Sequence, residues 1–84
     1  NNPYEQTAYI LKKIEKALAQ AGASLQDVVR TRMFVTDISR FDEYAKAHGE
    51  AFAKIKPCTS MIEVKGLVSP GYLIEIEATA ILSA

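Results

Sequence analysis

The order of helical and strand patterns along the chain is the feature that most constrains its fold. Apolar residues recur at helical spacing in two segments, and they alternate with other residues in three. In chain order, these segments are a helix from Pro3 to the stop residue Gly22, a strand over 28–36, a helix over 40–54, and strands over 59–64 and 72–82. The middle three form a βαβ crossover with parallel strands, to which the last strand adds antiparallel. This order predicts an α+β fold, a mixed sheet with both helices on one face.

The first helix has clear start and stop signals. Asn2 is a typical N-cap residue, Pro3 suits the first helical position, and Gly22 suits the position after the C-cap. The spacing predicts a sheet-facing stripe of Ile10, Ile14, Ala17, Leu18 and Ala21. The opposite side carries Lys12, Lys13 and Lys16. We interpret these lysines as a solvated helix face, with a nucleic-acid contact as the alternative.

The second helix is predicted to start at Ser39 as N-cap. Its expected inward stripe consists of Phe41, Tyr44, Ala45, His48, Phe52 and Ile55. His48 is the single histidine, so a metal site would need Cys58 or carboxylates to complete it, and a structural role in the interior is favoured. Gly49 weakens a helix interior, and close approach of another backbone would explain it.

Charged residues interrupt one face of each long strand. Val29, Met33 and Val35 are expected on one side of strand 28–36, with Arg30, Arg32 and Phe34 on the other. In strand 72–82, the alternation places Tyr72, Ile74, Ile76, Ala78 and Ala80 under the helices, and Glu75 and Glu77 on the opposite face. The arginines either clamp an anionic ligand or pair with acidic side chains of neighbouring strands. The glutamates either pair with these arginines or position a water beside Thr59.

Composition narrows the class of protein. The 84 residues fit one domain, and a three-stranded sheet of this size is marginal alone, which favours association with copies of itself. Ten basic and ten acidic side chains cancel, so nucleic acid is not an expected partner. There is no apolar run long enough to span a membrane. The single cysteine, Cys58, fits a reducing, cytoplasmic compartment.

Three segments together resemble the Rid/YjgF family of reactive-intermediate deaminases. They are residues 28–37 (VVRTRMFVTD), 57–64 (PCTSMIEV) and 73–78 (LIEIEA), in this order. The resemblance implies a chorismate-mutase-like fold and a homotrimer with ligand clefts between subunits, without a metal or cofactor. Family members are longer and begin with a β-hairpin that this sequence lacks, so residues 1–84 are interpreted as a single domain equivalent to the C-terminal two-thirds of a member.

The resemblance also assigns roles to individual positions. The family's turn contains an Arg that binds the substrate carboxylate, and Thr59 occupies its place. A hydroxyl cannot replace a planar cation with five donors, so recognition of a 2-imino acid should fall sharply. The family's Asn aligns with Ala45 and its Cys with Met61. Its water-holding carboxylate is kept at Glu75. The expected site is therefore Glu75 as the catalytic group, with Cys58, Thr59 and Ser60 as ligand-binding residues.

Three functions follow from this comparison. The first is binding or hydrolysis of a small imine- or enamine-like molecule that lacks a carboxylate in the usual place. The second is RNA binding or endoribonuclease activity, which the zero net charge disfavours. The third is a non-enzymatic trimer that acts as a binding or chaperone-like surface.

Overall fold

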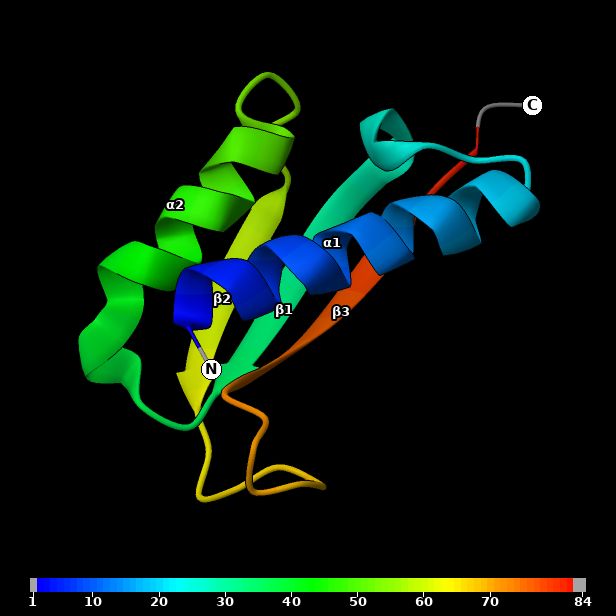
Figure 1. Ribbon diagram of the computed structural model, residues 1–84. Helices are drawn as coiled ribbons and strands as arrows, with labels where there is room; N and C mark the ends of the chain where they lie inside the picture. The colour runs from blue at the N-terminus through cyan, green and yellow to red at the C-terminus, as the bar shows by residue number, and fades with distance from the viewer. Residues whose placement is uncertain (1, 83–84) are drawn as a thin grey trace.

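The computed structural model describes residues 2–82, and the order of its elements confirms the α+β prediction. The helices and strands are α1 (Pro3–Gln20), β1 (Val28–Val35), α2 (Phe41–Phe52), β2 (Cys58–Glu63) and β3 (Ile74–Ala80), with short 3-10 helices at Leu25–Asp27 and Ile38–Arg40. The sheet has the order β2-β1-β3, with β1 parallel to β2 and antiparallel to β3. Both helices cover one face of it, and the loop between β2 and β3 extends past one end (Figure 1).

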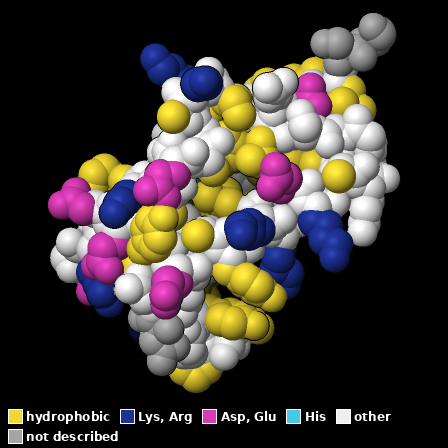
Figure 2. Space-filling model, turned by 45° about the horizontal axis from the view of Figure 1, so that its top comes forward, with side chains coloured by type: hydrophobic (Ala, Val, Ile, Leu, Met, Phe, Trp, Pro, Cys, Tyr) yellow, Lys and Arg dark blue, Asp and Glu magenta, His cyan; other side chains and the backbone are white. Residues whose placement is uncertain are grey.

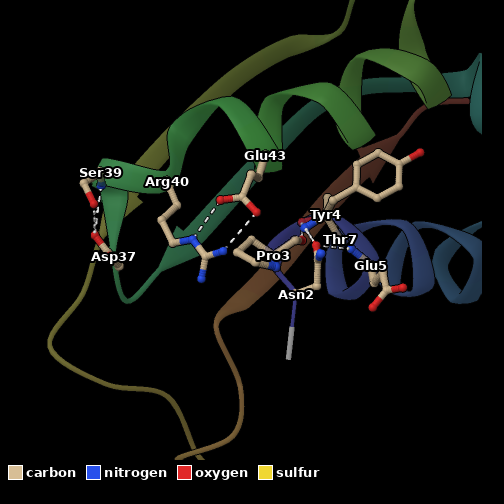
Figure 3. A network of polar contacts seen from close by, with 9 residues as sticks. All are labelled: Asn2, Pro3, Tyr4, Glu5, Thr7, Asp37, Ser39, Arg40 and Glu43. Atoms are coloured by element: carbon tan, nitrogen blue, oxygen red, sulfur yellow. Dashed lines mark hydrogen bonds and ion pairs between the residues drawn. The ribbon is translucent and has the colours of Figure 1, made fainter.

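Local signals at both ends of α1 are confirmed. The Oδ1 atom of Asn2 accepts from the backbone N–H groups of Tyr4 and Glu5, at 2.8 and 3.2 Å, as drawn in Figure 3. At the other end Gly22 has φ of 82°, a left-handed conformation that glycine adopts without strain. The backbone N–H groups of Gly22 and Ala23 then return to the carbonyls of Ala19 and Leu18, which satisfies the last turn.

The core lies between the sheet and the two helices. One cluster of buried residues contains Met33, Val35, Tyr44 and Ile74, and a second contains Leu11, Val28 and Phe52. Ile10, Ile14 and Leu18 pack against these clusters, as the helical spacing predicts. Ala17 and Ala21 are exposed, so their assignment to the inward stripe is wrong. Thr7 and Leu11 take inward positions instead, so the buried stripe of α1 is rotated by a small part of a turn from the predicted one.

The predicted alternation of β1 fails at the first two residues of the strand. Val29 is 45% exposed, and Val28 is buried in its place. The pairing of β1 with β3 shifts register between Val28 and Arg30, and such an irregularity reverses which side chain points inward. From Thr31 onward the expected alternation holds, with Thr31, Met33 and Val35 buried.

The start of α2 also differs from the prediction. Ser39 lies inside the 3-10 helix, where its backbone N–H and its hydroxyl donate to Oδ1 of Asp37 at 3.0 and 2.5 Å (Figure 3). The residue preceding α2 is Arg40, which forms no side-chain cap but pairs with Glu43 at 2.8 Å. Ser39 is therefore not the N-cap. Phe41 is 52% exposed, because the inward stripe of α2 begins at Tyr44.

Two further expectations are corrected. A Cβ built on Gly49 would have no neighbouring atom of residues 2–82 within 4 Å, so close approach of a backbone from this part of the chain does not explain the glycine. Tyr72 is 54% exposed and precedes β3, which begins only at Ile74. The rest of the predicted inward face of β3, from Ile74 to Ala80, is buried or half-buried.

Candidate functional site

The sheet separates the predicted site residues onto its two faces. Thr59 is paired with Thr31, which is buried beneath α2, so the Thr59 side chain points to the helix-covered face. Cys58 and Ser60 are paired with Arg30 and Arg32, and alternation places all four on the open face. All three predicted ligand-binding residues are exposed. Thr59 thus does not share a surface with its two neighbours in the chain.

Glu75 lies on the open face as well, opposite Phe34 of β1. It is therefore on the other side of the sheet from Thr59, and about 10 Å further along the strands because three residue positions separate Phe34 from Thr31. Within one protomer the sheet therefore keeps Glu75 away from Thr59, and the positioning of a water by Glu75 stays a prediction.

The two carboxylates of β3 have different surroundings. Glu77 is opposite Arg32, and the two side chains form an ion pair of 2.7 Å. This pair confirms the structural interpretation of Arg32 and Glu77. Arg30 is opposite Thr79 and therefore has no carboxylate across from it. Within residues 2–82, no ion pair is found for Glu75.

A cavity of about 340 Å³ adjoins Glu75 on the open face. Phe34 forms one wall, and the other walls come from the two glutamates and from the loop after β2. The full lining is Phe34, Val64, Gly66, Leu67, Val68, Glu75 and Glu77. Val68 is 88% exposed at its rim. The loop residues Gly66 to Val68 therefore lie beside the predicted catalytic carboxylate.

A set of hydrogen-bonded polar side chains lies on the other, helix-covered face of the sheet, under α2. The hydroxyl of Thr31 is 2.8 Å from Nε2 of His48 and 2.9 Å from the hydroxyl of Thr59. The Thr59 hydroxyl is in turn 3.1 Å from the carbonyl oxygen of Pro57. The His48 ring packs on Phe52, with 4.7 Å between the centroids, and burial lowers the pKa of His48 below its usual value.

Sequence reasoning placed His48 in the interior but missed its partner. Thr31 is completely buried, and it connects α2 to the start of β2. The sequence did contain a signal, because Thr31 is a polar residue that alternates with the inward-facing Met33 and Val35. Its partners depend on the register between strands 28 residues apart, which no local pattern specifies.

The helix side carries further hollows. One of about 360 Å³ lies between α1 and the chain leading into β3, and includes Gln6, Tyr9, Lys13 and Tyr72. Gln6 holds the segment before β3 in place, because its side-chain amide donates to the carbonyl of Gly71 at 3.0 Å and accepts from the N–H of Leu73 at 2.8 Å. Figure 2 shows apolar side chains exposed among charged ones on this side of the molecule.

The lysines of α1 are exposed and do not converge on one ligand site. Lys12 borders a groove of about 430 Å³ between the two helices, whereas Nζ of Lys13 lies 5.4 Å from the ring centroid of Tyr9. Across residues 2–82, no three His, Cys, Asp or Glu side chains group as metal ligands. In the same part of the chain, no helix is both long and apolar enough to cross a membrane.

Comparisons with known proteins agree on one family. The family description Endoribonuclease L-PSP matches residues 1–82. A RutC family protein of Pyrococcus abyssi is 37% identical over 76 residues, which are 90% of this chain and 59% of the relative. A protein of Acinetobacter baylyi named 3-aminoacrylate deaminase RutC is 35% identical over 75 residues, 89% of this chain and 59% of the relative.

The fold is shared with solved structures. A member of the YjgF/YER057c/UK114 family from Mycobacterium tuberculosis superimposes with a TM-score of 0.90 and 58% identity, over 90% of this chain and 64% of that one. The chain thus spans about three-fifths of the length of the relatives that it matches.

Proposed function

Because this chain belongs to the Endoribonuclease L-PSP family, which includes the RutC and YjgF proteins, we propose that it binds and hydrolyses a small imine or enamine. The proposed site is a cleft between subunits of a homotrimer in the cytoplasm. One relative carries the name of a deaminase of 3-aminoacrylate, which is an enamine. The exposed free thiol of Cys58 is in keeping with a reducing compartment.

The observation that carries the proposal is the free carboxylate at the open-face cavity. Glu77 is held by Arg32, whereas Glu75 borders the same cavity with no ion pair in the described chain. A carboxylate in this position can accept a proton from a water molecule. The water oxygen then bonds to the imine carbon, and the proton held by Glu75 passes to the imine nitrogen, which gives a carbinolamine. The hydroxyl proton of the carbinolamine is transferred to the nitrogen as the C–N bond breaks, so ammonia leaves and a carbonyl product forms.

The two faces of the sheet support a site shared between copies. Glu75 and Thr59 lie on opposite faces, so one small ligand can contact both only if they come from different subunits. The open face also leaves Ile62 40% exposed and Phe34 only half-buried. Uncovered apolar side chains beside a marginal core favour burial against further copies.

The substrate is proposed to lack the carboxylate that the family's Arg binds. Thr59 has one hydroxyl proton, and that proton has an acceptor in the Pro57 carbonyl. An Arg side chain offers five donors in a planar fork. A neutral imine therefore fits this chain better than a 2-imino acid.

The test compares ammonia release from two imines generated in the assay. An amine oxidase supplies a neutral imine, and an amino-acid oxidase supplies a 2-imino acid. The protein should accelerate hydrolysis of the neutral imine, Glu75→Gln should abolish that acceleration, and the 2-imino acid should react at the rate in buffer.

Glu77→Gln is the matched control. It removes a carboxylate from the same strand and face, but one held in an exposed ion pair that contributes little stability. The proposal fails if neither imine reacts faster than in buffer, or if Glu77→Gln lowers the rate as much as Glu75→Gln. The endoribonuclease name of the family supplies the rival outcome, RNA cleavage that depends on Lys12, Lys13 and Lys16.

A further inference from the structure

The hydrogen bonds that join His48 to Pro57 form an unbranched series, and its last acceptor determines the direction of every bond. A carbonyl oxygen can only accept, so the 3.1 Å contact with Pro57 uses the hydroxyl proton of Thr59. Thr59 has no second proton, so the 2.9 Å contact must be donated by the hydroxyl of Thr31. Thr31 has then used its own proton. The 2.8 Å contact must be donated by Nε2–H of His48.

Burial makes this assignment specific for one tautomer. His48 is 9% exposed and packs on Phe52, and burial disfavours the charged imidazolium. The neutral ring carries one proton, and the series places it on Nε2. Nδ1 is then the unprotonated nitrogen.

At the exposed end of the series, which is Thr59 and Pro57, only hydrogen-bond acceptors remain available to a ligand. Thr59 is exposed. Its hydroxyl proton is donated to the Pro57 carbonyl, and one of its lone pairs accepts the hydrogen bond from Thr31. What remains for a ligand is the second lone pair of the Thr59 hydroxyl and the second lone pair of the Pro57 carbonyl. Both of these atoms attract N–H donors and repel a carboxylate.

We propose that Thr31 and His48 hold Thr59 as a hydrogen-bond acceptor, so that the ligand at this end of β2 presents N–H groups, as an amidine, amide or protonated amine does. This proposal rests on the proposed function in that it assigns ligand chemistry to the same cleft. Thr31 and His48 are positioning residues, because they act through Thr59. The polarity is the reverse of the arginine site that the resemblance describes, where the protein donates and the ligand accepts.

The first test is spectroscopic and requires neither substrate nor turnover. Long-range ¹H–¹⁵N NMR of the labelled chain should show the His48 Nε2 resonance as protonated and the Nδ1 resonance as unprotonated. The opposite tautomer would overturn the proposal, because the bonds would then run from Thr59 toward His48. This readout is independent of imine hydrolysis, so its failure is distinguishable from failure of the proposed function.

The second test measures binding with probes matched in shape. Benzamidine and benzamide should cause saturable shifts at the backbone amide of Thr59, and benzoate should not. Thr59→Val keeps the side-chain shape but removes the acceptor, and should weaken benzamidine binding by roughly two- to tenfold, as expected for one hydrogen bond. Preference for benzoate, equal binding to Thr59→Val, or no saturable shift with any probe would each refute the proposal.

A variant pair tests the positioning role. Thr31→Val removes the donor to Thr59, whose hydroxyl is then free to turn toward a ligand and donate, so the discrimination between benzamidine and benzoate should shrink. Thr31→Ser keeps the hydroxyl and should restore both the discrimination and the His48 tautomer. If Thr31→Val keeps full discrimination while its ¹H–¹⁵N spectrum shows a folded chain, Thr31 has no positioning role.

Discussion

Tyr44 gives the sharpest test of the core, because its phenol is buried without a partner. The residue is completely inaccessible and belongs to the cluster with Met33, Val35 and Ile74. No hydrogen-bond partner for its hydroxyl is found among residues 2–82. Burial is also the main cause of the raised pKa of Tyr44. Tyr44→Phe should therefore stabilise the protein.

The size of the effect follows from the lost hydration. In the unfolded chain water satisfies the phenol, and burying a polar group without a partner costs about 1–3 kcal/mol. Phenylalanine keeps the ring and its contacts, so the substitution removes this cost without creating a large cavity. For a domain of 84 residues, each kcal/mol moves the melting temperature by roughly 4–8 °C. The expected rise is at least about 4 °C.

Urea and thermal unfolding at one protein concentration measure the change, since association would make stability depend on concentration. The urea midpoint should rise at an unchanged slope. Tyr4→Phe is the matched control, because the Tyr4 phenol donates to the carboxylate of Glu50 and its loss should leave stability equal or slightly lower. A Tyr44→Phe variant less stable than the parent would show that the phenol has a partner, and would refute the reasoning.

Three further perturbations test other parts of the structure. Gly49→Ala should stabilise α2 by about 0.5–1 kcal/mol in urea unfolding, because no atom of residues 2–82 lies within 4 Å of the added methyl; a loss of stability would show a hidden contact. Gln6→Ala should cost about 1–3 kcal/mol in the same assay, because the half-buried N–H of Leu73 loses its acceptor; exposed Gln20→Ala should not. The pKa of His48 is lowered by burial, so below pH about 6.5 the unfolded chain binds a proton that the folded chain resists, and stability should fall as pH falls; His48→Gln should flatten this dependence.

Much of the fold could be read from local patterns. The cap at Asn2 and the left-handed Gly22 follow from the chemistry of single residues. Alternation correctly placed Glu75 and Glu77 away from the helices. It failed at Val29, because a shift of strand register changes the inward residue without changing the sequence pattern.

The sequence by itself determined the order of the elements, the faces of most of each strand and the resemblance to one family, since these depend on residues close together in the chain. Only the tertiary structure decided that Thr59 and Glu75 lie on opposite faces of the sheet, and that Thr31 connects His48 to Thr59. Both results depend on the register between β1 and its neighbours. That register is set by how the buried side chains pack beneath the helices. Thr31 is 17 positions from His48 and 28 from Thr59, and it meets both only in the folded chain.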